Sequence, residues 1–361
     1  MSLRDYVTLG RSGLRVSPLC LGAMTFGPDW GWGSAVEDSK RIIDAYLDAG
    51  GNFIDTANIY TKGHSEAIIG DHLGRSPARR DRTVIATKFM GNLYPGDPNG
   101  GGAGRKAILA ACEESLRRLR TAYIDLYWMH FHDPHTPMDE TMRALDDLVR
   151  AGKVRHIGFS DTPAWVCTQA QYEAIFRHWT PLIALQIEYS LLERTVEADL
   201  IPMARALGLG VTPWSPLKGG ILTGKYSRTK RPTEGRGTSE WITGQLNERV
   251  YKLVDALQSI AGQTHGTPAR VALAWVQSRP GVASSIIGAR TLDQLTDNLA
   301  ALDVHLLPEH LHTLDELTRP EMPFPHEFLT RVRSIAQGGT SINGARAEVW
   351  PLAPRSDAER H

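Results

Sequence analysis

The 361-residue sequence has no excess of either charge. Forty Lys and Arg residues balance forty Asp and Glu residues, so no overall field attracts nucleic acid or an anionic membrane surface. No apolar run approaches the roughly 18 residues that mark a membrane span, and the first residues, Met-Ser-Leu-Arg-Asp-Tyr, lack the apolar centre of a signal peptide. We therefore expect a cytoplasmic protein that acts on a small molecule, without a nucleic-acid or membrane partner.

Cysteine is scarce. Cys20, Cys112 and Cys167 are an odd number at wide spacing, without a CxxC pair or a Cys/His pattern typical of metal sites, so we expect buried, reduced thiols and no metal. A GxGxxG fingerprint after an early strand is also missing. The glycine cluster at 100–104 follows a loop rich in Pro and Gly rather than a strand, which disfavours an open dinucleotide-binding sheet.

Strand-like apolar runs alternate with helix-like segments along most of the chain. The helix-like segments place apolar residues three and four positions apart, as in Ile108, Cys112 and Leu116. Eight such alternations in a chain of this length favour a closed (β/α)8 TIM barrel, an α/β fold, over an open doubly wound sheet. The expected strands are 19–21, 52–55, 83–88, 124–130, 154–160, 184–190, 210–216 and 284–288.

Three regions depart from this alternation. Residues 6–18 contain two short extended pieces around a glycine turn, which predicts a β-hairpin that closes the lower end of the barrel. Residues 226–244, after the seventh strand, are a polar loop. Residues 319–361 carry five prolines and little periodicity. We expect a barrel domain over residues 1–318 and a C-terminal extension that is either a lid on the catalytic face or a subunit contact.

Four polar side chains lie at or just beyond the ends of successive apolar runs. Asp55 ends Asn-Phe-Ile-Asp, Tyr60 follows five residues later, Lys88 ends Val-Ile-Ala-Thr-Lys, and His130 ends Leu-Tyr-Trp-Met-His. The carboxyl ends of parallel barrel strands meet at one rim, where this fold places its chemistry. Each residue alone is more often a cap, a packing residue or a solvated group. Their arrangement on consecutive strands predicts an active site.

An acid, a phenol, an amine and an imidazole suit the reduction of a carbonyl group. Reduction needs a proton donor at the oxygen, where negative charge grows in the transition state, and Tyr60 is the expected donor. An isolated tyrosine has a pKa of about 10, and a nearby cation lowers it. Lys88 is expected to supply that cation, with Asp55 holding the ammonium in place. His130 is expected to hydrogen-bond the carbonyl oxygen and orient it.

Eight short motifs are spread over the chain. They are Gly-Ala-Met-Thr-Phe-Gly at 22–27, Phe-Ile-Asp-Thr-Ala at 53–57, Ala-Thr-Lys at 86–88, Ser-Leu-Arg-Arg-Leu at 115–119, Tyr-Ile-Asp-Leu-Tyr at 123–127, Gly-Phe-Ser at 158–160, Gln-Ile-Glu-Tyr-Ser at 186–190 and Trp-Ser-Pro-Leu at 214–217. In this order they closely resemble the aldo-keto reductase superfamily, in register over about residues 6–317. The resemblance looks closest to the branch with general bacterial reductases and potassium-channel beta subunits. It implies a (β/α)8 barrel that binds NADPH at its carboxyl rim without a metal, and it selects His130 over the nearby His132.

The resemblance also assigns the nicotinamide site residue by residue. Ser160 and Gln186 match the polar positions that hold the carboxamide, and Trp214 matches the aromatic position that stacks on the ring. Gly22 falls among the implied cofactor positions. The usual residue after Ser160 is asparagine, whereas this chain has Asp161. A carboxylate can accept from the carboxamide amine but cannot donate to its oxygen, so we expect Asp161 to bind differently or to weaken affinity.

Two further segments resemble phosphate-binding loops. Arg290 offers a planar, charged fork suited to a phosphate monoester, so NADP(H) is preferred to NAD(H). Ile287 stands where proline is frequent in the family, and the commoner cationic positions hold Gly288 and Gln294. The resemblance implies Ser215, Leu217, Gly219 and Lys225 for the pyrophosphate, and Gly288, Arg290, Gln294 and Asn298 for the adenosine phosphate.

Aromatic and apolar residues after the first, third and fourth strands suit a hydrophobic aldehyde or ketone, with packing under the loops as the alternative. An NADPH-binding regulatory subunit with little turnover would use the same site, as would a dehydrogenase that oxidises a sugar or secondary alcohol. Monomers and homo-oligomers are both consistent with the sequence. The expected pocket residues are Trp30, Trp32, Met90 and Phe131.

Overall fold

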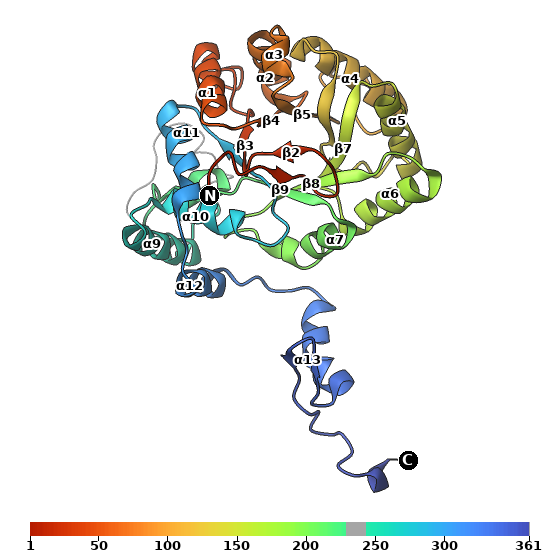
Figure 1. Cartoon of the computed structure of the whole chain (residues 1–361), viewed down its shortest axis with the longest axis vertical. Helices are drawn as coiled ribbons and strands as arrows, with labels where there is room; N and C mark the ends of the chain where they lie inside the picture. Colours follow the sequence, from red (N-terminus) through yellow and green to blue (C-terminus); the bar gives the residue numbers. More distant parts are fainter. Residues whose placement is uncertain (229–242, 361) are drawn as a thin grey trace. The chain divides into compact units, whose positions relative to one another are not determined.

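The computed structural model describes residues 1–228 and 243–360, and the chain divides into two compact units, Met1–Arg319 and Pro320–His361. The first unit is a (β/α)8 barrel, which confirms the predicted fold class (Figure 1). Its parallel strands follow one another around the barrel in chain order, and the last strand pairs with the first. They are β3 (Leu19–Gly22), β4 (Phe53–Asp55), β5 (Val84–Phe89), β6 (Ile124–Met129), β7 (Val154–Ser160), β8 (Leu182–Glu188), β9 (Gly210–Trp214) and β10 (Ser285–Gly288).

The barrel closes between β9 and β10 at a single point. Val211 forms a parallel bridge with Val282, and the amide of Ala283 donates to the Val211 carbonyl at 2.8 Å. All the other neighbouring strands pair over two or more residues. The ring of strands is therefore nearly closed, and the carboxyl ends of the strands share one rim.

Helices connect successive strands and surround the barrel, as Figure 1 shows. Their apolar faces pack on the outer faces of the strands in one large buried cluster, which is how a helix with one apolar stripe is stabilised. They are α1 (Val36–Asp48), α2 (His64–Ile69), which continues into a π-helical turn at Gly70–Gly74, α3 (Pro77–Arg80), α4 (Arg105–Leu119), α5 (Met138–Arg150), α6 (Ala164–Arg177), α7 (Leu200–Leu207), α9 (Glu248–Gln263), α10 (Pro268–Gln277), α11 (Leu292–Leu299) and α12 (Pro308–Thr318).

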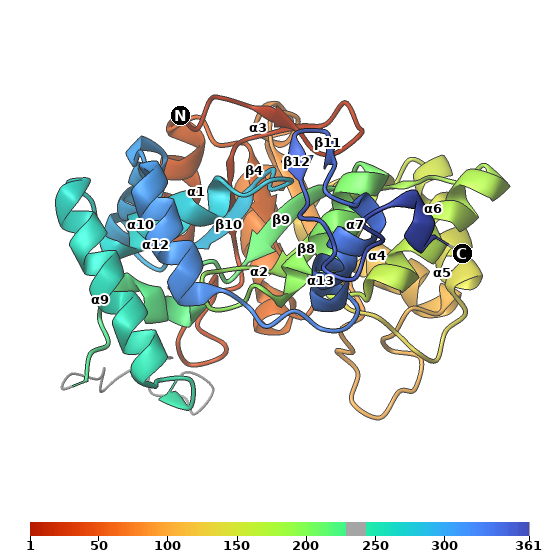
Figure 2. The same ribbon diagram turned by 90° about the horizontal axis from the view of Figure 1, so that it is seen from below.

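A second apolar cluster fills the inside of the barrel. Successive residues of a strand point to opposite faces, and the inward-facing set includes Cys20, Phe53 and Trp128. The predicted hairpin is present: β1 (Val7–Thr8) and β2 (Arg15–Val16) pair antiparallel. Leu9 and Val16 from this hairpin belong to the interior cluster. Figure 2 shows the hairpin at one end of the strands and the long orange loop after β5 at the other. The hairpin therefore covers the amino end, and the carboxyl rim is the open end.

The second unit contains a helix that the sequence analysis did not predict. Residues His326–Gln337 form α13, followed by a short hairpin of β11 (Ser341–Ile342) and β12 (Ala345–Arg346). Apolar residues at 328, 332 and 335 have helical spacing, and Glu327 and Arg331 form an i,i+4 ion pair. The five prolines made the whole region look irregular, but all of them lie outside this helix.

Most of the polar loop expected at 226–244 falls on residues 229–242, which lie outside the described residues. Its first residue, Tyr226, is fully buried against Ile221, Val250 and Val254 rather than solvated. Within the described ranges, none of the helices combines the length and the apolar character that crossing a membrane requires.

Candidate active site

The four predicted catalytic side chains meet at the open rim. Asp55 is the last residue of β4, Lys88 is the penultimate residue of β5, and His130 directly follows β6. Tyr60 begins a short 3-10 turn, Tyr60–Gly63, after β4. Because β4 pairs with β5 and β5 pairs with β6 in parallel register, residues at the ends of these strands lie side by side.

Lys88 connects the group. Its ammonium donates to the Asp55 carboxylate, to the Thr56 carbonyl at 2.8 Å and to the Tyr60 hydroxyl at 3.3 Å. Lys88 is 0% exposed, so these acceptors replace water around the charge. Burial is the largest influence and lowers the pKa of Lys88, but Asp55 and Tyr60 together outweigh it and raise the pKa above its ordinary value. The ammonium therefore stays charged.

The hydroxyl of Tyr60 stays protonated at neutral pH. Burial is the largest influence on its pKa and raises it, Lys88 lowers it, and the net pKa lies above the ordinary tyrosine value. Lys88 thus lowers the pKa of Tyr60, as predicted from the sequence, but burial raises that pKa by more. A neutral phenol next to an ammonium is a hydrogen-bond donor and a source of a proton.

A strained turn fixes the position of Tyr60. Thr61, Lys62 and Gly63 have φ values of 46°, 61° and 91°, and the left-handed region costs a non-glycine residue roughly 1–2 kcal/mol. The Thr61 hydroxyl donates to the Phe26 carbonyl at 2.8 Å and accepts from the Ser65 amide at 2.9 Å. These bonds hold the turn, and the turn directs the phenol toward Lys88.

His130 lies across the ring of Tyr60 and is neutral. The two ring centroids are 5.7 Å apart at an interplanar angle of 79°. Burial, and secondly the charge of Lys88, lower the pKa of His130 to about 3. Its Nδ1 atom is buried and has no hydrogen-bond partner among the described residues. A neutral imidazole keeps one N–H donor, so Tyr60 and His130 place two neutral hydrogen-bonding side chains next to each other at the rim.

Gln186 contacts the Asp55 carboxylate, and this contact was not predicted from the sequence. Its Nε2 donates to Asp55 Oδ1 at 3.0 Å, while Lys88 binds the other carboxylate oxygen. The sequence predicted Gln186 only as a cofactor residue. Strand alternation could have predicted this contact. Ala184 belongs to the interior cluster, and Gln186, two residues later on the same strand, points to the same side.

The residues predicted for the nicotinamide lie together on β7, β8 and β9. Ser160 is opposite Gln186 in the β7–β8 pairing, and Trp214 is opposite Glu188 in the β8–β9 pairing. The half-buried indole of Trp214 offers an aromatic face, while Ser160 and Gln186 offer a hydroxyl and an amide. This set fits a flat, aromatic amide such as nicotinamide.

Asp161 is bound to two of these residues. Trp214 Nε1 donates to Asp161 Oδ1 at 2.9 Å, and Ser160 Oγ donates to Asp161 Oδ2 at 3.3 Å. The backbone φ of Asp161 is 41°, a left-handed value that Asp and Asn both tolerate. Part of the side chain reaches solvent. Desolvation by the surrounding rim nevertheless raises the pKa of Asp161 to about 6, against the opposing effect of the two hydrogen bonds.

The loop after β9 contains four residues with left-handed backbone. Ser215, Lys218, Gly219 and Gly220 have φ values of 54°, 47°, 61° and 94°. The Gly219 amide donates to Ser215 Oγ at 3.3 Å, and the Gly220 amide donates to the Leu217 carbonyl at 2.9 Å. Successive residues in such conformations bring backbone amides to one side of a loop.

The two lysines of this loop differ. Lys218 is 7% exposed and donates to Glu188 Oε1 at 2.7 Å, so its charge is paired inside the rim and does not suit a phosphate. Lys225 lies over the loop glycines, because a Cβ at Gly220 would come within 2.6 Å of its Nζ. Of the two, Lys225 is the better candidate for binding phosphate.

The predicted adenosine-phosphate residues run from Gly288, the last residue of β10, through Arg290 to Gln294 and Asn298 in α11. The Arg290 amide donates to Gln294 Oε1 at 2.9 Å, and Asn298 Nδ2 donates to the Gly288 carbonyl at 3.1 Å. The side-chain amides of Gln294 and Asn298 thus hold the backbone between β10 and α11. The exposed guanidinium of Arg290 donates to the Trp32 carbonyl at 3.3 Å.

Gly22 has a packing explanation. A Cβ at this position would lie 2.7 Å from Cγ2 of Ile286 on the neighbouring strand β10. Contact between two strands therefore requires a glycine here, independently of any cofactor.

Three of the four predicted pocket residues lie around Tyr60 and His130. Trp30 packs edge-on against Tyr60 at a centroid distance of 6.3 Å, and Trp32 lies 5.6 Å from Trp30. Phe131 is 45% exposed and lies 5.6 Å from the His130 ring. Met90 is only 6% exposed and belongs to the outer core cluster. Its position favours packing over substrate contact.

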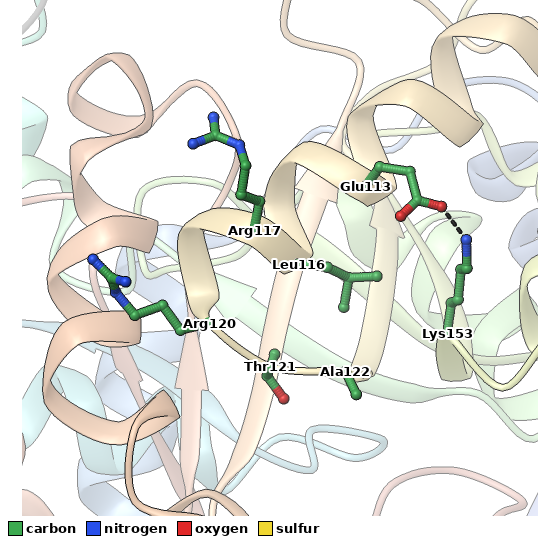
Figure 3. A pocket seen from close by; sticks show the side chains of 7 residues that line it. All are labelled: Glu113, Leu116, Arg117, Arg120, Thr121, Ala122 and Lys153. Carbon is green, nitrogen blue, oxygen red and sulfur yellow. Dashed lines mark hydrogen bonds and ion pairs between the residues drawn. The ribbon is translucent and has the colours of Figure 1, made fainter.

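A groove of about 570 Å³ lies away from these residues (Figure 3). Its wall includes Thr121 and Ala122, which precede β6, whereas His130 follows that strand. The groove is therefore at the amino end of the barrel. Its cations are paired, Lys153 with Glu113, Arg117 with Glu114 and Arg120 with Asp71.

Comparisons with known proteins agree with this geometry. A model of the Aldo/keto reductase family matches residues 18–319. An uncharacterized oxidoreductase of Bacillus subtilis (strain 168), YrpG, is 41% identical over 322 residues, or 87% of this chain and 95% of the relative. An aryl-alcohol dehydrogenase of Phanerodontia chrysosporium, with NADP(+) in its name, is 34% identical over 332 residues, 87% of this chain and 86% of the relative. A probable voltage-gated potassium channel subunit beta of Oryza sativa subsp. japonica is 37% identical over 307 residues, 83% of this chain and 92% of the relative.

Proposed function

Because the chain belongs to the aldo/keto reductase family and is an oxidoreductase, we propose that it reduces aldehydes or ketones to alcohols with NADP(H), reversibly. The single observation that carries this proposal is the buried ammonium of Lys88, held between the Asp55 carboxylate and the Tyr60 hydroxyl beside a neutral His130. A protonated phenol and an imidazole N–H directed at one oxygen are what carbonyl reduction requires of a protein.

Each catalytic residue has one role in this proposal. Tyr60 donates its proton to the carbonyl oxygen as negative charge develops there. Lys88 stabilises the resulting phenolate, which lowers the cost of giving up the proton. Asp55 keeps Lys88 charged and in place. His130 donates a hydrogen bond to the same oxygen and so sets the orientation of the carbonyl group.

The cofactor proposal has support from the rim residues. When bound, the reduced nicotinamide supplies the hydride. Ser160, Gln186 and Trp214 would hold the nicotinamide, Lys225 the pyrophosphate and Arg290 the 2'-phosphate. The name of the relative from Phanerodontia chrysosporium, which includes NADP(+), favours the phosphorylated cofactor. Equal catalytic efficiency with NADH and NADPH would overturn this preference.

The substrate proposal is an aromatic or otherwise hydrophobic carbonyl compound. Trp30, Trp32 and Phe131 surround Tyr60 and His130 with aromatic surface, which favours a flat apolar substrate. Several similar proteins are named aryl-alcohol dehydrogenases, so oxidation of an aromatic alcohol is the second candidate. A third candidate is an NADPH-binding accessory subunit with little turnover, which the similar channel subunit suggests.

The test follows NADPH consumption with aliphatic, aromatic and bulky cyclic carbonyl compounds, beside the variant Tyr60→Phe. Tyr172→Phe, which changes an exposed tyrosine of α6, is the matched control. We expect turnover by the parent and the control, and near-complete loss in Tyr60→Phe. Tight NADPH binding without turnover of any carbonyl or alcohol would favour the accessory subunit instead.

A further inference from the structure

We propose that the Asp161 carboxylate makes this site bind the oxidised, positively charged nicotinamide more tightly relative to the reduced, neutral form than a site with a neutral residue would. The inference rests on the proposed function, because it concerns NADP(H) at the same rim. It concerns one residue, at the position where the family resemblance leads us to expect asparagine.

Asp161 places a carboxylate beside the proposed nicotinamide site. Asp161 directly follows β7, and one of its oxygens accepts from Trp214 Nε1 at 2.9 Å. Trp214 ends β9 and is the residue proposed to stack on the nicotinamide. The other oxygen accepts from the hydroxyl of Ser160, which is proposed to hold the carboxamide. The carboxylate is therefore bound to two of the residues that form the nicotinamide site.

Lysines neutralise the two carboxylates that neighbour that site. Asp55 is paired with Lys88, and Glu188 is paired with Lys218. Each of these pairs sums to zero net charge. The two hydrogen-bond partners of Asp161, Trp214 and Ser160, are both neutral. Among the described residues, no ion pair balances the negative charge of Asp161, whereas lysines balance the two neighbouring carboxylates.

The two states of the cofactor differ in the charge of the nicotinamide ring. Oxidised nicotinamide carries a positive charge on its ring, and reduced nicotinamide does not. A fixed negative charge at the rim attracts the first and leaves the second nearly unaffected. Tighter binding of the oxidised cofactor relative to the reduced cofactor changes the balance between the two reaction directions. A site with Asp161 should therefore favour alcohol oxidation more than the same site with asparagine would.

Asp161→Asn isolates the charge. Asparagine tolerates the left-handed backbone at this position, and its side-chain oxygen can still accept from the Trp214 indole. Asp161→Ala removes both the charge and the acceptor. Asp139→Asn is the matched control, because it removes an exposed carboxylate from the first turn of α5.

The experiment measures dissociation constants for NADP(+) and NADPH by calorimetric titration of the full chain, at a pH well above 6. The readout is the ratio of the two constants. Asp161→Asn should weaken NADP(+) relative to NADPH by roughly 3- to 10-fold, as expected for one charge acting across a solvent-facing rim. Asp161→Ala should give a shift of at least the same size, and Asp139→Asn should give none.

The other outcomes separate this inference from the proposed function. An unchanged ratio in Asp161→Asn overturns it, and a shift in Asp161→Ala alone assigns the effect to the hydrogen bond with Trp214 instead. If the parent binds neither cofactor form, the proposed function and this inference both fail. If both forms bind and the ratio shifts while carbonyl compounds are not turned over, the proposed reductase activity fails and the inference stands.

Discussion

Gln186 and Lys88 bind opposite oxygens of the same carboxylate, that of Asp55. A residue proposed to hold the cofactor is thus in direct contact with the carboxylate that is proposed to position the Lys88 ammonium. The contact spans 131 residues of sequence, and it joins β4 to β8 across the mouth of the barrel. Cofactor affinity and catalysis are therefore expected to depend on one hydrogen-bonded group.

Gln186→Ala tests this coupling. The substitution removes a neutral donor to a buried carboxylate, a bond to a charged group worth roughly 1.5–3 kcal/mol. We expect weaker NADP(H) binding together with a lower kcat, both measured by steady-state kinetics and titration. The exposed Gln169→Ala on α6 is the control and should change neither quantity. Weaker binding with an unchanged kcat would show that the contact with Asp55 has no catalytic effect.

Lys88→Met tests the buried ion pair. The variant leaves the Asp55 carboxylate, 2% exposed, without its cation, and an uncompensated buried charge costs about 3–5 kcal/mol of unfolding free energy. Denaturant titration should show this loss. Adding Asp55→Asn removes the orphaned charge, so the double variant should recover stability but not activity. Equal stability of the single and double variants would contradict the assignment.

His130 gives a prediction about pH. Its pKa is about 3 in the fold, against roughly 6.5 for an unperturbed histidine. Between these values the unfolded chain binds the extra proton, so the contribution of His130 to stability is lost as the pH falls from about 6.5 toward 3. His130→Gln should flatten the decline of the urea midpoint between pH 7 and pH 5, in a comparison with the exposed His135→Gln as control. Parallel declines in the parent and in His130→Gln would refute the low pKa.

The elements predicted from the sequence were those with a local signal. All eight strands and the hairpin were predicted, because apolar runs and alternation depend only on neighbouring residues. Asp55, Lys88 and His130 followed from their places at strand ends.

The missed features depend on partners far away in the chain. Examples are the bond of Gln186 to Asp55 and the pairing of Lys218 with Glu188, which set the role of each side chain. The strained turn after Tyr60 was also missed, since Thr61 and Lys62 are not residues that favour left-handed backbone.

Gly220 provides a last prediction, about the loop after β9. Its φ is 94°, and a methyl group there would lie 2.6 Å from Lys225 Nζ. Gly220→Ala therefore introduces backbone strain of about 1–2 kcal/mol and displaces the ammonium proposed to bind the pyrophosphate, so the dissociation constant for NADP(H) should rise. Gly262→Ala is the matched control, because Gly262 lies in α9 and, apart from its neighbours and the backbone of its own helix, no described atom lies within 4 Å of the added group. Alanine there should stabilise the fold by roughly 0.5–1 kcal/mol. Calorimetric titration measures the affinity and thermal unfolding the stability. If Gly220→Ala lowers stability but leaves affinity unchanged, Lys225 is not a phosphate ligand.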